Sequence, residues 1–218
     1  MTGPAPDEAP AFADAFRADL ARLFAWRRDV RRFRPDPVPE DLVDGLIDLA
    51  HLSPSVGNSQ PWRWVRVDSP DKRAEIRANF QDCNAHAQAE YPDEHADAYA
   101  ALKLEGLDKA PLQLAVFCDK ATLQGHGLGQ RTMPEAAEYS TTNMIATFWL
   151  AARAAELGVG WVSILDPERV SQNLDVPPAW KFIAYLCVGW SEEQHLDPEL
   201  ERFGWQARTD AGRQVKIV

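Results

Sequence analysis

The densest group of chemically capable side chains is a run of five arginines and one aspartate between Arg27 and Arg34, with a segment charge of +4. Arginines this close in sequence repel one another, and guanidinium groups bind phosphate through paired hydrogen bonds. The segment therefore favours an anion site, with a solvated basic face as the alternative. We expect Arg27, Arg28 and Arg31 at the end of a first helix, where positive charge would also complement the helix dipole. Asp29 could accept N–H groups of a polar ligand, or it could only neutralise its neighbours.

Two loops carry further polar chemistry. The stretch from Ser53 to Trp62, with the sequence SPSVGNSQPW, is dense in hydroxyl and amide groups and ends on an aromatic residue. Such a loop either joins a helix to a strand or holds a polar heterocycle. Gly125, Gly127 and Gly129 follow an expected strand, but their spacing departs from the dinucleotide-binding motif. We interpret them as a mobile loop or lid.

Composition disfavours several classes of function. The 23 basic and 33 acidic residues give a net charge of −10, which argues against binding to nucleic acid. No apolar run approaches the length of a membrane span, so we expect no membrane partner. The five histidines and three cysteines lack metal-ligand spacing, and we expect no metal. The sequence contains no G-x-S-x-G motif, so nothing in it indicates a serine hydrolase.

Cysteine usage and the N-terminal residues bear on location and domain organisation. Three widely spaced cysteines cannot form a complete disulfide framework, which favours a reducing, cytoplasmic compartment. Residues 1–10 are rich in proline, alanine and acidic side chains, and they indicate a disordered lead-in rather than a signal peptide. Residues 11–218 are expected to form a single domain.

Apolar periodicity and capping signals predict the elements that must position these residues. Helices are expected at residues 11–26, from Pro39 to about Pro54, from Pro70 toward Ala89, at 94–109, from Pro134 to Leu157 and briefly after Asp166. Strands are expected at 62–67, 112–118, 161–165 and 181–188. Gly158 is expected to cap the longest helix in the left-handed conformation. Ser163 would lie within a buried strand.

The order of these elements lacks strict β–α–β alternation, which predicts an α+β fold with a mixed sheet packed under long helices. The last residues, about 191–218, have no helical period and are expected to form an extended arm. Apolar residues of that arm, such as Leu196, Leu200 and Trp205, would be exposed unless the arm wraps a partner.

Three sets of motifs carry a resemblance to a known family. They are RRDVRRF at residues 27–33, PSVGNSQPW at residues 54–62, and GQRTMPE with GVGWVSIL at residues 129–135 and 158–165. Together they resemble the FMN-dependent nitroreductase superfamily, and the third set is similar to its flavin-fragmenting branch, the 5,6-dimethylbenzimidazole synthases. The resemblance implies an α+β homodimer that binds FMN at its interface and exchanges its C-terminal arms.

The resemblance also implies roles for individual residues. Contacts with FMN would come from Arg27, Arg28, Asp29, Val30, Arg31, Ser55, Lys103, Ser163 and Arg208. The arginines would hold the phosphate and ribityl oxygens, and Ser55 would reach the flavin across the dimer interface. Asp29 and Ser163 would be the catalytic residues.

The implied reaction consumes reduced FMN as a substrate, together with molecular oxygen. Its products would be 5,6-dimethylbenzimidazole, which is the lower ligand of vitamin B12, erythrose 4-phosphate and dialurate. A separate flavin reductase would supply the FMNH2. Asn58 gives the polar loop the general nitroreductase form N-x-Q-P-W. An NAD(P)H-dependent FMN nitroreductase or reductive dehalogenase, and a flavin-binding carrier without catalysis, therefore stay open as alternatives.

Overall fold

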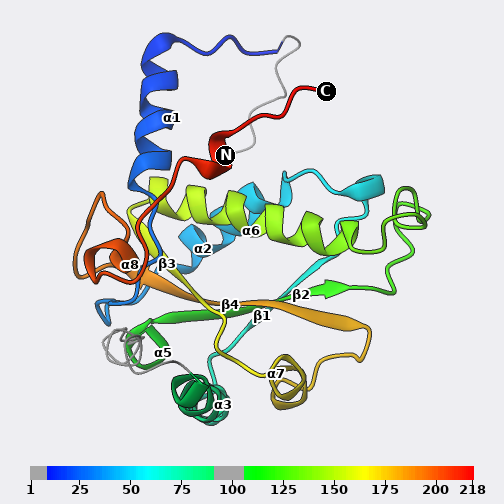
Figure 1. Cartoon of the computed structure of the whole chain (residues 1–218). Coiled ribbons are helices and arrows are strands. Elements are labelled where there is room, and N and C mark those ends of the chain that lie inside the picture. The colour runs from blue at the N-terminus through cyan, green and yellow to red at the C-terminus, as the bar shows by residue number, and fades with distance from the viewer. Residues whose placement is uncertain (1–8, 91–105) are drawn as a thin grey trace.

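A computed structural model describes residues 9–90 and 106–218, with a four-stranded sheet at the centre (Figure 1). The strands lie in the order β1 (Trp62–Arg66), β2 (Leu112–Asp119), β4 (Trp180–Trp190) and β3 (Leu157–Val162), and neighbouring strands pair antiparallel. Parallel pairing among the described residues is limited to one bridge outside these strands' own ladders, between Asp29 and Val159. The predicted α+β fold is confirmed, but the sheet is antiparallel rather than mixed, because each of its strand pairs is antiparallel.

Two helices cover one face of the sheet. α2 (Glu40–His51) and α6 (Ala136–Ala154) lie above the strands in the view of Figure 1. The 3.6-residue period of each helix turns an apolar stripe toward the strands. Leu46 of α2 and Phe148 of α6 are buried there in one cluster with Leu114 of β2.

Three further helices cover the opposite face. They are α3 (Pro70–Glu90), α5 (Gly106–Lys109) and α7 (Pro167–Asn173), drawn below the sheet in Figure 1. Because successive side chains of a strand point to opposite faces, Phe117 of β2 packs on this side with Ile76 of α3. The result is a sheet sandwiched between two helical layers.

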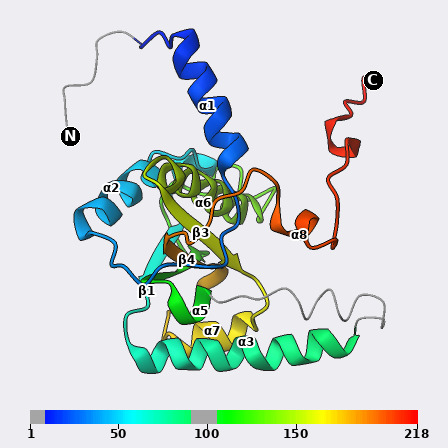
Figure 2. The same cartoon turned by 90° about the vertical axis from the view of Figure 1, so that its left-hand side faces the viewer.

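A helix at the N-terminal end projects from this body. α1 (Asp14–Trp26) stands away from the sandwich in both Figure 1 and Figure 2, and it confirms the helix predicted at 11–26 to within three residues at its start. None of its residues is buried. The apolar stripe that predicts it is largely uncovered, with Phe16 47% and Phe24 55% exposed.

The end of the longest helix differs from its prediction. α6 ends at Ala154 rather than Leu157, and the left-handed conformation falls on Glu156 (φ 65°) rather than Gly158. Gly158 lies inside β3, so the strand predicted at 161–165 begins four residues earlier. The chain around Val30 packs directly over this strand at Gly158. The absence of a side chain at Gly158 therefore permits this packing and does not serve a helix cap.

The C-terminal arm also differs from its prediction. It contains a short helix, α8 (Glu199–Arg202), and a 3-10 turn at Ala211–Arg213, although its sequence has no helical period. Beyond α8 the arm runs away from the body (Figure 2).

Some expectations fall outside the part of the chain that the structure describes. The helix predicted at 94–109 does so except for its last turn, α5, and so do residues 1–8 of the predicted lead-in. Within residues 9–90 and 106–218, no helix combines the length and apolar character that a bilayer span requires.

Candidate functional site

The arginine-rich segment begins where α1 stops. The helix ends at Trp26, so Arg27, Arg28 and Arg31 lie beyond its last turn, and the predicted interaction with the helix dipole is wrong. Arg27 already has an extended backbone, with φ −70° and ψ 119°. An extended segment can pair with the edge of a sheet, which a helical turn cannot do.

This segment lies along β3, the edge strand of the sheet. The N–H of Val30 donates to the Val159 carbonyl at 3.0 Å, next to the bridge that joins Asp29 to Val159. Further along, the segment reaches the neighbouring strand, where the N–H of Arg34 donates to the carbonyl of Trp190, the last residue of β4, at 2.8 Å. The segment thus covers an edge whose backbone groups would otherwise be unpaired.

Two glycines of β3 make this close approach possible. A Cβ atom on Gly160 would lie 2.1 Å from the Val30 carbonyl oxygen, and one on Gly158 would lie 2.8 Å from a methyl carbon of the Val30 side chain. Both distances are far below van der Waals contact. Glycine inside a strand commonly marks such an approach of a second backbone. The GVGWVSIL motif therefore seats the arginine-rich segment.

Asp29 is fixed to the same strand by its side chain. Its Oδ1 accepts the Trp161 N–H at 2.9 Å, and its Oδ2 lies 3.6 Å from Nε of Arg31. Burial raises the pKa of the Asp29 carboxyl above its usual value, and the Trp161 N–H and the Arg31 charge offset this only in part. The Asp29 carboxyl is thus held in one position on β3, and it takes up a proton more readily than an ordinary aspartate.

Arg31 has buried side-chain donors that make no hydrogen bond within the described part of the chain. Its side chain is 11% exposed, and its Nη1 lies 4.0 Å from Oε1 of Glu199, too far for a hydrogen bond. Neither Nε nor Nη1 of Arg31 has a hydrogen-bond partner among the described residues. Buried donors of this kind are costly unless a ligand completes them. Arg31 therefore fits an anionic group such as a phosphate.

The other arginines surround Arg31 with positive charge. Arg28 donates through Nε to the Leu196 carbonyl at 2.8 Å, and burial, followed by the charges of Arg208 and Arg27, lowers its pKa. The guanidinium of Arg27 lies over the Trp149 ring, 5.1 Å from its centroid. The C-terminal arm thus places the charge of Arg208 beside that of Arg28.

A cavity of about 130 Å³ opens between the segment and the arm. It is lined by Arg27, Arg28, Asp29, Arg31, Pro198, Glu199, Leu200 and Arg208. Four arginines outnumber the two carboxylates on its walls. Within the described residues, no group of three or more His, Cys, Asp or Glu side chains could hold a metal ion.

Ser163 lies near Asp29 but not where the sequence places it. β3 ends at Val162, so Ser163 follows the strand and is exposed, rather than buried within it. It stands two residues beyond Trp161, whose N–H holds the Asp29 carboxylate. An exposed hydroxyl at this position is accessible to a ligand and can both donate and accept a hydrogen bond.

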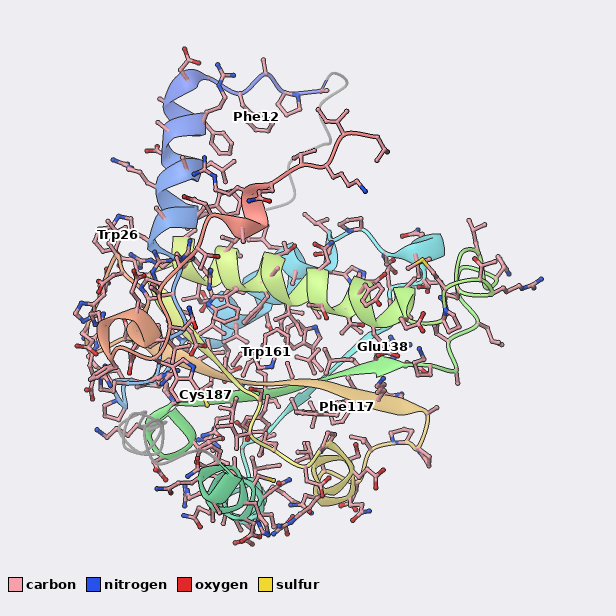
Figure 3. The ribbon with its side chains drawn as sticks, viewed as in Figure 1. Phe12, Trp26, Phe117, Glu138, Trp161 and Cys187 are labelled. Atoms are coloured by element: carbon pink, nitrogen blue, oxygen red, sulfur yellow. The ribbon has the colours of Figure 1, made fainter. Side chains whose placement is uncertain are left out.

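Ser55 lies far from the arginines of the same chain. The adjacent Val56 N–H donates to Oγ of Ser140 on α6, whereas Trp149 of α6 donates to the Arg28 carbonyl. Nine residues of helix separate these two contacts, about 14 Å along the axis. In Figure 3, Glu138 is labelled near the start of α6 and Trp26 beyond the other end of that helix. The chain alone therefore does not bring Ser55 to Arg28.

The glycine loop packs against the loop that carries Ser55. Nε2 of Gln124 donates to the Asn58 carbonyl at 2.8 Å and to Oε1 of Gln60 at 2.9 Å. Gly125 and Gly129 adopt positive φ angles of 81° and 76°. The two polar loops recognised in the sequence thus form one surface.

Lys103 lies outside the described residues. Gly106, three residues later, opens α5 and lines a small cavity together with Asp29, Arg31 and Cys187. α5 therefore begins beside the candidate site.

Sequence reasoning missed two contributors. Trp149 lies under Arg27, and its indole N–H donates to the Arg28 carbonyl at 3.2 Å. Glu199 projects from the arm into the arginine group. The spacing of Trp149 in its helix is typical of a core residue, and Glu199 in a polar tail matches no motif, so the sequence predicts a role in the site for neither.

The chain resembles known proteins along most of its length. A family model described as the Nitroreductase family matches residues 24–190. A relative from Rhodospirillum rubrum named 5,6-dimethylbenzimidazole synthase is 62% identical over 91% of this chain and 94% of its own, and one of the same name from Rhodobacter capsulatus is 51% identical over 89% and 94%. A crystal structure of iodotyrosine deiodinase bound to FMN and 3-iodo-L-tyrosine shares the fold, with a TM-score of 0.69, 21% identity and coverage of 81% of this chain and 91% of that one.

The arginine-rich segment, the glycines that seat it and the polar loop all lie within the matched region. The chain therefore belongs to the Nitroreductase family, and within it to the group of the 5,6-dimethylbenzimidazole synthases.

Proposed function

We propose that this protein fragments reduced FMN with molecular oxygen, and that it forms 5,6-dimethylbenzimidazole, erythrose 4-phosphate and dialurate. One observation carries the proposal: buried Arg31 donors without partners adjoin the held carboxylate of Asp29, in a chain 62% identical to a relative named for this synthase activity. Guanidinium donors without hydrogen bonds favour the binding of an anion, and the Asp29 carboxylate would act as a base beside that anion.

The phosphate of FMN would bind in the arginine-lined cavity. Arg31 offers two donors that lack a hydrogen bond, while Arg27, Arg28 and Arg208 add charge around it. Arginine suits this task because its planar fork matches phosphate oxygens. The segment that bears Arg31 is seated on β3, so the phosphate would be held at a fixed distance from the strand end.

Reduced FMN, when bound, supplies the electrons that reduce oxygen. Asp29 would accept a proton from the ribityl chain, since a raised pKa makes its carboxylate a better base than an ordinary aspartate. Ser163, exposed at the end of β3, would donate a hydrogen bond to the flavin edge or to an oxygen atom. Val30 would contact FMN from the arginine-rich segment. Lys103, which precedes α5 in the sequence, would contact the flavin ring.

We also propose a homodimer, in the cytoplasm, that receives FMNH2 from a separate flavin reductase. Support for the dimer comes from the position of Ser55, about 14 Å along α6 from the arginines of its own chain. A second copy could present its own Ser55 to the flavin. The uncovered apolar stripe of α1, including Phe16 and Phe24, also favours a partner surface.

The test supplies FMN, NADH, a flavin reductase and air, and measures 5,6-dimethylbenzimidazole by chromatography. Wild-type protein should form it, and Asp29→Asn should lower its rate by about 100-fold or more, the usual range for loss of a general base. Asp36→Asn, which removes an exposed carboxylate of the same region, is the matched control and should retain the rate. Turnover of NADH with a nitroaromatic, without added reductase and without the benzimidazole, would instead assign a nitroreductase. Intact recovery of FMNH2 would assign a carrier.

A further inference from the structure

Glu199 places a carboxylate inside the arginine-lined cavity. It is the first residue of α8, and its side chain is 10% exposed. Its Oε1 and Oε2 each lie 3.3 Å from a terminal nitrogen of Arg32, and its Oε1 lies 4.0 Å from Nη1 of Arg31. An anion of the protein thus stands beside the donors that fit an anion of the ligand.

The contacts of Glu199 are unequal. Arg32 binds it with both terminal nitrogens, whereas Arg31 faces it without a hydrogen bond and keeps Nε and Nη1 unpaired. Arg32 therefore holds the Glu199 carboxylate in place. A phosphate that bound Arg31 would lie close to this negative charge, and like charges a few ångströms apart in a half-buried site repel strongly.

We infer that Glu199 sets the affinity of the site for the phosphate group, by weakening it. The inference deepens the proposed function and rests on it. FMN and the erythrose 4-phosphate formed from it would carry the same phosphate. A site that gripped this group tightly would hold substrate and product equally, which does not help turnover. Glu199 shifts binding from the phosphate toward the flavin ring, which the sugar-phosphate product lacks.

Glu193 provides a matched control. It also pairs with Arg32, its Oε1 accepting from Nε at 2.7 Å, but it does not contact Arg31 and is absent from the lining of the 130 Å³ cavity. His195 and Arg32 hold the pKa of Glu193 at about 2, so it is a carboxylate at neutral pH. Glu193→Gln and Glu199→Gln therefore each remove a charge from Arg32, and only the second removes a carboxylate that lies 4.0 Å from Arg31.

The experiment measures the dissociation constants of oxidised FMN, riboflavin and inorganic phosphate for the wild type, Glu199→Gln and Glu193→Gln. Quenching of flavin fluorescence reports the flavins, and competition with FMN or calorimetry reports phosphate. Glu199→Gln should bind FMN and inorganic phosphate about tenfold more tightly, equivalent to about 1.4 kcal/mol. Its affinity for riboflavin, which has no phosphate, should stay the same. Glu193→Gln should match the wild type for all three ligands.

The inference is overturned if Glu199→Gln binds phosphate and FMN as the wild type does, or more weakly, or if riboflavin or Glu193→Gln shows the same gain. Glu199→Ala gives a second measurement should the first variant lose its fold, as judged by circular dichroism. None of these readouts requires turnover. If FMN binds to neither the wild type nor Glu199→Gln, the proposed function fails. The titration with inorganic phosphate still decides the role of Glu199 in that case.

Discussion

At the scale of single residues, the candidate site depends on polar side chains that do not make all the hydrogen bonds they could. Asp29 keeps a carboxyl in a half-buried position with one N–H donor, from Trp161, and one guanidinium at 3.6 Å, from Arg31. Arg31 keeps two donors unpaired. Such groups reduce the stability of the free protein and become useful when a ligand completes them.

The raised pKa of Asp29 predicts how stability changes with pH. A carboxyl whose pKa is higher in the folded than in the unfolded state favours folding while it is protonated, and this contribution is lost as pH rises through the folded value. Asp29→Asn does not titrate. The free energy of unfolding of Asp29→Asn should therefore increasingly exceed that of the wild type as pH rises above about 4, the ordinary aspartate value.

Urea denaturation at a series of pH values measures this difference. Asp36→Asn, which removes a carboxylate 3.8 Å from Arg34 on the exposed part of the segment, controls for a general change in charge. A difference that shrinks with rising pH would mean that the folded protein lowers the pKa of Asp29 and stabilises its charged form.

At the scale of elements, the site depends on the fit between an extended segment and an edge strand. Val30 pairs with Val159 and lies over Gly158 and Gly160. The arginines on either side of Val30 can reach one cavity because this contact fixes the backbone between them. The glycines of β3 thus contribute to ligand binding without touching the ligand.

Gly160→Ala tests that fit. A methyl group at this position would meet the Val30 carbonyl oxygen at 2.1 Å, so the segment must move off the strand. We expect a loss of stability of about 1–3 kcal/mol, the usual cost of overpacking, together with weaker binding of FMN. Thermal unfolding and flavin titration measure the two effects.

The matched control is Gly45→Ala in α2, where a Cβ atom would meet nothing within 4 Å. This variant should be neutral or more stable by up to about 1 kcal/mol, since alanine favours a helix over glycine. Unchanged FMN binding in Gly160→Ala would show that the arginines bind FMN without the close contact between Val30 and β3.

The sequence predicts what depends on neighbouring residues and misses what depends on distant contacts. The apolar stripes of α1 and α2 and the cap of α7 at Asp166 are local patterns, and each is found where expected. The sequence around Gly158 predicts a helix cap, because Val30, whose packing requires the glycine, lies far away in the chain. Glu199 could not be assigned a role, because only the docking of the arm brings it to Arg32.

At the scale of the whole molecule, the account predicts a homodimer with composite sites. Light scattering should give twice the 24.4 kDa mass of one chain. Arg31→Ala should abolish phosphate binding in one chain, and Ser55→Phe should block the flavin bound by its partner. Mixing the two inactive variants after mild dissociation should restore about a quarter of the wild-type rate, because half of the dimers would then contain one unaltered site of two.

A monomer, or a mixture that stays inactive although the chains exchange, would contradict this composite site. Exchange can be followed with two affinity tags, and a mixture of Arg31→Ala with wild type controls for loss of activity during dissociation. The position of Ser55 beside Ser140, remote from Arg28, would then reflect a role in loop structure alone.

The central claim is that the flavin is consumed, and a single turnover tests it most directly. FMN is reduced anaerobically, bound to an excess of the protein and mixed with oxygenated buffer, and the flavin, the benzimidazole and hydrogen peroxide are then quantified. The account predicts that 5,6-dimethylbenzimidazole appears in equal amount to the FMN that disappears, with little peroxide. Quantitative recovery of oxidised FMN together with hydrogen peroxide would contradict it.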